Sequence, residues 1–456
     1  MDKRIDILKN TPIPKAIITM ALPAIIGMMV MAIYNIVDTM FVAWLGTNAT
    51  GATQVVYPLV TIITAIGLTI GIGGGSYISR LLGQNKQKEA SSVVSSLYFS
   101  AFGIGIVFMI LGLIFLRPLL TLLGASESIM AFAYDYGFFI LLGSAFQITN
   151  MALNNMLRAE GSAKNSMIGM MSGALLNIAL DPIFIFGLGL GIKGAAIATS
   201  ISQLFSTVVL SYQYFGNKSV LKISFGNVKI DKNLFSEVFK IGTPSFFRQL
   251  FVSISLALVN NVAIKYGGEV GIAGVGIVMR TMTIVMFVIF GLGQGFQPVA
   301  GYNYGAGNKE RLLEAFKFTL KASFLVALSF SIVFILGGKY IFSIFRPTEE
   351  VLTIALSFMR YFLLSLMMMS ISNVIATYYQ ALGKAGPAFV LSVARQGIFF
   401  IPALIILPSI FQLRGLFYAQ PLADAITLIA SIMLFLYTER NTFKQIESEK
   451  LVYQND

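Results

Sequence analysis

The chain alternates between long apolar runs and short polar segments. A run of about 20 apolar residues is long enough to cross a bilayer as a helix. Charged or Gly/Pro-rich segments separate the apolar runs, and twelve of the apolar runs reach this length. We predict spanning helices at 16–45, 54–79, 92–116, 132–157, 166–188, 194–215, 238–263, 271–300, 316–337, 352–381, 388–410 and 414–437.

The second half of the chain repeats the first. Pro23 and Pro244 are separated by 221 residues, and Asp38 is separated from Asn260 by 222. The offset stays nearly constant along the chain, which indicates an internal duplication. Each half holds an even number of spans, so the two copies have the same orientation in the membrane. Parallel repeats of this kind are a transporter architecture with a site at their interface.

This pattern predicts an all-α polytopic membrane protein with twelve transmembrane helices in two six-helix bundles. A pseudo-two-fold axis along the membrane normal relates the bundles. We divide the chain into an N-terminal bundle, a cytoplasmic linker, a C-terminal bundle and a cytoplasmic tail, at 1–215, 216–237, 238–438 and 439–456.

Composition excludes several classes of protein. Of 456 residues, 56% are hydrophobic and 11% are charged, whereas about a quarter of a soluble domain is charged. The chain has no Cys and no His, so disulfides, thiolate metal sites and the usual proton carrier are ruled out. Any proton chemistry must fall to Asp or Glu. The glycine-rich run 71–76 lacks the ending of a phosphate loop, and we expect neither an enzyme nor a cofactor beyond a coupling ion.

The net charge of +12 could suggest nucleic acid, but the basic residues gather in loops on one side of the predicted topology. The segment from Gly216 to Lys240, which includes the linker, carries five Lys, and Arg158 and Lys164 fall in another of these loops. This asymmetry is the positive-inside rule. We expect a monomer in the cell membrane, with both termini in the cytoplasm, lipid as a partner and no nucleic acid.

Asp38 is an acid inside the first apolar run, which holds no other charge between Lys15 and Arg80. A charge at that depth costs a few kcal/mol or more, so such a residue normally faces a cavity, a partner or an ion. The alternative is an Asp near a helix end, wetted by the headgroup region.

The fifth span contains a second acid with an amide on the same face. Asn177 and Asp181 are four residues apart, one above the other on a helix. Pro182 has no N–H, which leaves the carbonyl of Ile178 without its helical partner. Amide, carboxylate and carbonyl oxygens are hard ligands that small cations accept.

If Asp38 and Asp181 meet in one pocket, a proton or a sodium ion could neutralise the pair. The bound ion would then set whether the helices pack straight or bent, with Pro23 and Pro182 as the places to bend. Tyr34 stands four residues before Asp38 and is an accessory candidate on the same face.

Other polar residues in the spans are candidates for the same site or for a substrate cavity. Asn154 and Thr199 could join the cation site, Na⁺ being a candidate at Asp38, Asn177, Asp181 and Thr199. Alternatively, Asn and Thr in membrane helices bridge neighbouring helices. We expect the substrate cavity to include Met286, Gln54 and Asp424.

Four arginines, Arg248, Arg280, Arg360 and Arg395, fall within or near apolar spans. Each could snorkel or pair with a carboxylate. Alternatively, they could line an anion-binding cavity.

In several segments the sequence resembles the multidrug and toxic compound extrusion (MATE) family, and within it the bacterial MepA-like and DinF-like branch. The segments are Leu22-Pro23, Tyr34-Asn-Ile-Val-Asp38, 76–83, Leu157-Arg-Ala-Glu-Gly161, 176–187 and 194–199. The resemblance implies twelve helices in two V-shaped bundles. It also implies export of cationic amphiphilic compounds in exchange for H⁺ or Na⁺. The family's N-terminal cation site matches here as Asp38, Asn154, Asn177, Asp181 and Thr199.

Two functions follow from these observations. The first is a secondary multidrug exporter that works by alternating access and cation antiport, with small cationic amphiphiles as substrates. The second is a lipid-linked saccharide flippase of the same superfamily, which predicts a central cavity rich in Arg and Lys. A passive channel is disfavoured because the intramembrane acids gather in one half of the chain.

Overall fold

The protein is described by a computed structural model covering residues 3–216 and 219–453. Long helices make up almost all of it, and strands are absent from the described residues. The helices are α1 (Lys3–Lys9), α2 (Ile13–Ala43), α3 (Thr47–Gly83), α4 (Gln87–Ile114), α5 (Leu116–Leu122), α6 (Glu127–Ala159), α7 (Ala163–Pro182), α8 (Ile192–Phe215), α9 (Lys232–Gly305), α10 (Lys309–Ser343), α11 (Glu349–Ala381), α12 (Ala385–Val393), α13 (Ile401–Phe411) and α14 (Leu413–Tyr453). Two π-helical segments, η1 (Ile183–Gly187) and η3 (Ala394–Phe400), and a 3-10 turn, η2 (Phe225–Asn227), connect them.

Eleven helical stretches among the described residues are long and apolar enough to cross a membrane, and α9 accounts for two crossings. Its 74 residues would make a straight rod of about 110 Å, far longer than a bilayer is thick. The chain instead turns at Gly268, where φ is 61° and ψ is −155°, a conformation that glycine adopts without strain. The predicted all-α, twelve-span fold is therefore confirmed.

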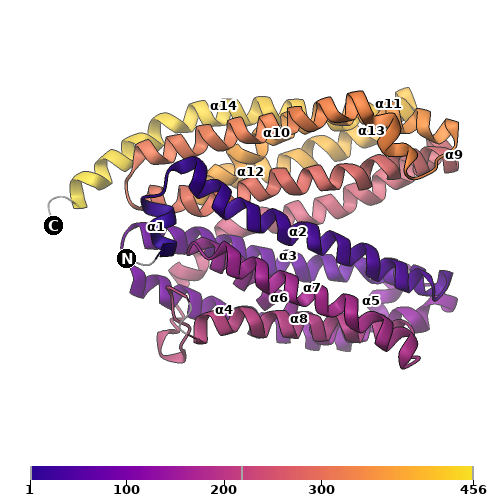
Figure 1. Cartoon of the computed structure of the whole chain (residues 1–456), viewed down its shortest axis with the longest axis horizontal. Coiled ribbons are helices and arrows are strands. Elements are labelled where there is room, and N and C mark those ends of the chain that lie inside the picture. The colour runs from indigo at the N-terminus through magenta and orange to yellow at the C-terminus, as the bar shows by residue number, and fades with distance from the viewer. Residues whose placement is uncertain (1–2, 217–218, 454–456) are drawn as a thin grey trace.

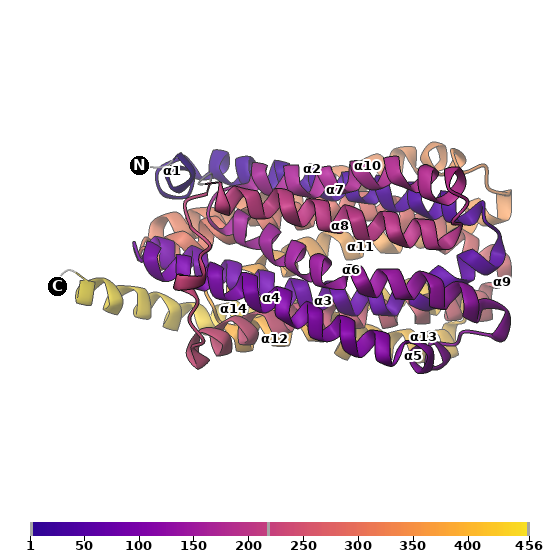
Figure 2. The same ribbon diagram turned by 90° about the horizontal axis from the view of Figure 1, so that it is seen from below.

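The two halves of the chain form two layers (Figure 1). Helices α3 to α8 lie in one layer and α10 to α14 in the other, and both termini lie at the same end of the molecule. Figure 2 shows the same arrangement from below. One apolar core runs from the first half across to Phe296, Tyr302 and Tyr378 of the second. A second core belongs to the second half alone.

The contact between the halves repeats the internal symmetry of the sequence. On α3 and α9, a Cβ at Gly73 would lie 2.0 Å from the carbonyl oxygen of Val238, and one at Gly242 would lie 1.9 Å from that of Thr69. On α2 and the second part of α9, Gly295 lies against Ala21 in the same way. Gly295 and Ala21 are the repeat counterparts of Gly73 and Gly242. Two equivalent seams of small residues therefore hold the halves together, as close approach of membrane helices requires.

Polar contacts join the halves near the end that carries the termini. Arg80 Nη2 lies 2.8 Å from Glu237 Oε1, between α3 and α9. Ser76 Oγ donates to the carbonyl of Gln380 on α11 at 2.5 Å. If this end is cytoplasmic, as the charge pattern predicts, the halves are closed against each other on the cytoplasmic side.

The described residues of the predicted linker, 216 and 219–237, pass along the first half before α9 begins at Lys232. They pack on the first half through a buried carboxyl group. Glu160, which follows α6, is fully buried and accepts hydrogen bonds from Ser162 Oγ at 2.8 Å and Ser219 Oγ at 2.5 Å. The guanidinium of Arg4 and the ring of Tyr214 interact with it electrostatically. Residues 217–218 of the linker and 454–456 of the tail lie outside the described residues.

Burial raises the pKa of Glu160 from 4.5 to about 7, against the opposing effects of Ser219, Ser162, Arg4 and the backbone N–H of Leu221. The folded state therefore holds a proton there that the unfolded state releases above about pH 4.5. The free energy of unfolding should therefore fall by about 3 kcal/mol at most as pH rises from about 4.5 to 7. Above that pH it should stay level.

Glu160→Gln copies the protonated form, so this part of the pH dependence should disappear and the variant should match or exceed wild-type stability at pH 8. Thermal unfolding of the purified protein at several pH values measures the effect. Glu314→Gln, at an exposed position on α10, serves as the control. An unchanged pH profile in Glu160→Gln would contradict the assignment.

Candidate functional site

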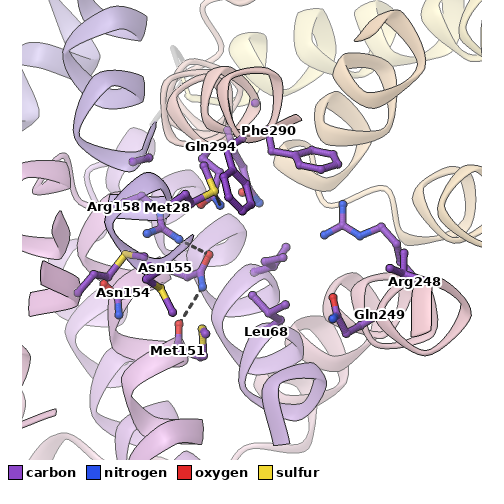
Figure 3. Close-up of a pocket in the computed structure, with 18 of the residues that line it drawn as sticks. Met28, Leu68, Met151, Asn154, Asn155, Arg158, Arg248, Gln249, Phe290 and Gln294 are labelled. Atoms are coloured by element: carbon purple, nitrogen blue, oxygen red, sulfur yellow. Dashed lines mark hydrogen bonds between the residues drawn. The ribbon is translucent and has the colours of Figure 1, made fainter. Parts of the chain in front are cut away.

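A cavity of about 430 Å³ lies between the two halves. Its wall is largely apolar and includes Met28, Leu68 and Phe290, together with many amide side chains. Figure 3 shows Asn154, Asn155 and Arg158 on one side of this space and Arg248 and Gln249 on the other. A largely apolar cavity of this size with a few polar groups is typical of small-molecule sites.

The two intramembrane acids of the first half meet beside this cavity. Asp38 of α2 and Asp181 of α7 lie in hydrogen-bonding contact. Asp181 is fully buried, and Asp38 is half-buried. Two ionised carboxylates at this separation would repel strongly in a dry site, so the contact requires a proton or another cation between them.

Asn177 holds Asp181 in place. With the Asn177 amide oriented to satisfy both of its polar atoms, Nδ2 donates to Asp181 Oδ2 at 2.8 Å and Oδ1 accepts from the backbone N–H of Thr199 at 3.2 Å. The first bond follows from the four-residue spacing on α7. Directly after the acid, Pro182 ends the regular helix and η1 begins. The helix therefore loosens at the residue that carries the acid.

Tyr34 and Thr199 separate the acids from the cavity. The Tyr34 hydroxyl and the Thr199 side chain are hydrogen-bonded, and Tyr34 also interacts electrostatically with both acids. Tyr34, Asn177 and Thr199 line the cavity, whereas neither Asp38 nor Asp181 is among the described residues of its wall. The carboxyl groups thus lie directly behind a polar wall that a substrate would touch.

Tyr136 is a further member of this group, and no sequence pattern indicated it. It is a buried residue of α6, close enough to interact electrostatically with Asp38, Tyr34 and Asp181. Its place in the sequence gave no signal, because it lies in a different span and repeats no spacing of the acids. It closes the acid pair on the side of α6.

Asn154 lies in a different network from the acids. Its Nδ2 donates to Asn150 Oδ1 at 2.5 Å, and its Oδ1 accepts from Ser166 Oγ at 2.9 Å. Asn150 in turn donates to Gln203 at 3.0 Å. This chain of amides runs along the cavity wall, and no described bond joins it to Asp38 or Asp181. The remaining four residues of the expected cation site do lie together.

The three residues expected at the substrate cavity lie around it rather than in its described wall. Gln54 is exposed on α3, and Met286 packs against the core of the second half. Asp424 is buried on α14, where it accepts a bond of 2.6 Å from Arg395 Nε and one of 3.0 Å from Gln420. Arg395, rather than Asp424, reaches the cavity.

The far ends of α2 and α7 meet through aromatic rings. The centroid of Trp44, just beyond α2, lies 5.4 Å from that of Phe41 and 6.0 Å from that of Phe186 in η1. Phe186 follows Pro182 and Trp44 follows Asp38, so this cluster joins the helical segments beyond the two acids.

The comparison with known families decides the class of the protein. The sequence model of the MatE family matches residues 23–183 and 244–406. The chain belongs to the MatE family. The two matched segments begin at Pro23 and Pro244, the pair that fixed the internal repeat.

Individual MatE proteins are similar over nearly the whole chain. The multidrug export protein MepA of Staphylococcus aureus (strain MSSA476) is 28% identical over 98% of this chain and 99% of its own length. A crystal structure of a MATE protein in complex with MaL6 has a TM-score of 0.91 and 26% identity, covering 98% of this chain and all of that one. An outward-facing multidrug resistance MATE transporter of the MOP superfamily has a TM-score of 0.89 and 26% identity over 97% of this chain and 98% of that one.

Proposed function

We propose that this protein is a secondary multidrug exporter that exchanges amphiphilic small molecules for protons. The observation that carries the proposal is the contact between Asp38 and Asp181 behind the wall of a largely apolar cavity. One proton shared by the pair satisfies this contact, and Tyr34 and Asn177 connect the pair to the wall. The similar MepA protein is a multidrug export protein, which agrees with export.

The coupling follows from the two helices. When the pair loses its proton, the carboxylates repel and α2 and α7 can no longer pack in the same way. Pro23 and the Pro182–η1 junction are the places where each helix can bend. A change in their packing alters the cavity wall at Tyr34 and Asn177, so protonation and substrate binding compete.

We propose that the structure represents the state closed on the cytoplasmic side. The glycine seams and the Arg80–Glu237 pair support this assignment, together with the positive-inside prediction for that end. Rocking of the two halves about their two-fold axis would give the opposite state. The apolar wall and Tyr34 suit the cationic amphiphiles expected from the family resemblance, through apolar burial and cation–π contact.

The flippase alternative predicts a cavity rich in Arg and Lys. Three Arg and no Lys are among the described lining residues. One of these, Arg395, is neutralised by Asp424, and Arg158 is bonded to Asn155 and Ser166. Among the described lining residues, this leaves only Arg248 to bind a pyrophosphate. A single cation is too few for the flippase, so the exporter is favoured.

Transport by proteoliposomes tests the proposal. We expect uphill movement of ethidium, or of another amphiphilic dye, when a pH gradient is imposed and none when a sodium gradient replaces it. Flux driven by sodium alone would assign Na⁺ as the coupling ion and overturn the proton assignment. If no member of a panel of cationic, neutral and anionic dyes moves with either gradient, the exporter proposal fails.

A further inference from the structure

The charged groups of the cavity wall are all cations. Arg158, Arg248 and Arg395 line it, and its described lining contains no carboxylate. A cavity meant for cations alone would be expected to offer a negative group to them, because a buried charge needs a partner of opposite sign. The charge of this wall therefore bears on which substrates it accepts.

Two of the three arginines are already bound within the protein. Arg395 forms an ion pair with Asp424, whose second oxygen is held by Gln420. Arg158 donates to Asn155 Oδ1 at 2.8 Å and to Ser166 Oγ at 3.0 Å. These contacts fix both guanidinium groups in the wall.

Arg248 is different. It projects from the first part of α9 toward the cavity, beside Gln249, as Figure 3 shows. No hydrogen bond or ion pair to it occurs among the described residues. The charge of Arg395 acts on it repulsively, and Arg395 is already paired with Asp424. A half-buried guanidinium at membrane depth without a partner is costly, and in such positions it normally meets an anion or a ligand.

We propose that Arg248 is an anion-binding group of the substrate cavity, and that it holds the carboxylate, or a similar single acidic group, of an amphiphilic substrate. This inference rests on the proposed export function and names a substrate class for it. The planar guanidinium suits a carboxylate through two parallel hydrogen bonds. Phe290, Met28 and Leu68 offer apolar surface for the rest of the molecule. The cavity would thus accept acidic or zwitterionic amphiphiles as well as cations.

Two xanthene dyes of nearly the same shape test this inference. Fluorescein carries a carboxylate, and rhodamine 123 carries a methyl ester and a positive charge. Their affinities for the purified protein can be measured by fluorescence anisotropy in detergent, with protein-free micelles as the blank. We expect Arg248→Gln to weaken fluorescein binding by about tenfold or more, because a charge-assisted pair is lost. Rhodamine 123 binding should stay the same or tighten.

Two further variants separate a ligand contact from a structural role. Arg248→Lys keeps the charge without the planar fork, so fluorescein affinity should lie between wild type and Arg248→Gln. Arg280→Gln removes an exposed arginine of the same helix, outside the described lining of the cavity, and should change neither affinity. Any of three results overturns the inference. Arg248→Gln could weaken the binding of both dyes equally, or it could leave fluorescein affinity at the wild-type value. The third such result is that the wild type does not bind fluorescein.

The test also separates this inference from the proposed function. If gradient-driven flux is absent for every dye but Arg248-dependent binding persists, the exporter proposal fails and the anion subsite stands. If cationic dyes are exported and Arg248→Gln leaves fluorescein binding unchanged, the exporter proposal stands and the anion subsite fails.

Discussion

We expect Asp181→Asn to reduce pH-gradient-driven dye efflux to the level of protein-free vesicles, while the variant still folds and binds substrate. The asparagine can still accept the bond from Asn177 Nδ2, so the local packing is kept. It cannot take up and release a proton, and Asp38 loses the partner with which we propose that it shares one. The variant should therefore lose coupling to the pH gradient and keep substrate binding, as expected of a residue that acts in coupling. Efflux from proteoliposomes and dye affinity in detergent measure the two parts.

Asp135→Asn is the matched control for this variant. Asp135 lies in the same half, near the surface, and contacts Lys193 at 3.3 Å. Its loss should leave uphill efflux unchanged, since an exposed ion pair contributes little. Wild-type rates of uphill efflux in Asp181→Asn would refute the proton-sharing pair as the coupling site.

Gly242→Ala opens the seam between the halves and lowers both stability and transport. The new Cβ would lie 1.9 Å from the carbonyl oxygen of Thr69, and backbone cannot give way as a side chain can. We expect a loss of about 1–3 kcal/mol in the free energy of unfolding from overpacking. The ends of α3 and α9 on the side of the termini should also move apart. Thermal unfolding measures the first effect.

Spin labels at Lys88→Cys and Glu310→Cys, both exposed positions in opposite halves, measure the second by electron–electron distance. The chain has no native Cys, so the labels need no background removal. Gly276→Ala is the control, because its Cβ would meet open space on the same helix α9. Both substitutions gain about 1 kcal/mol of helix propensity, so their difference isolates the clash. If Gly242→Ala and Gly276→Ala change the unfolding temperature and the spin-label distance equally, the close contact at Gly242 does not hold the halves together.

The fold was largely predictable from the sequence because lipid imposes simple rules. Apolar runs of sufficient length must be helices. Gly46 and Gly268 are 222 residues apart, which is the offset of the repeat, and both lie where the chain turns. Both have a positive φ in the structure. The short helices α1 and α5 and the π-helical segments were not predicted. They depend on local packing and on prolines rather than on hydrophobic length.

The site was predictable where its geometry is local. The spacing of Asn177 and Asp181 placed both side chains on one face of a helix, where the structure has them hydrogen-bonded. The cost of burying Asp38 indicated that it faces a cavity, a partner or an ion. Tyr136 could not be found, because contacts between distant spans leave no mark on a single sequence. The charge count placed Arg158 in a cytoplasmic loop, whereas it is 7% exposed and lines the cavity. Counting charges assigns a basic residue to a loop. The count fails for Arg158, because this residue lies in the last turn of α6 and its side chain points into the cavity.

The aromatic cluster beyond the two acids gives the protein an optical property. Trp44 is the only tryptophan in the chain. It is 63% exposed and touches Phe186 on the other acid-bearing segment. Indole emission depends on polarity and on ring contacts, so any rearrangement of α2 against η1 changes the surroundings of a single emitter. The native protein therefore carries its own fluorescent reporter of the proposed movement of α2 against α7, with no label added.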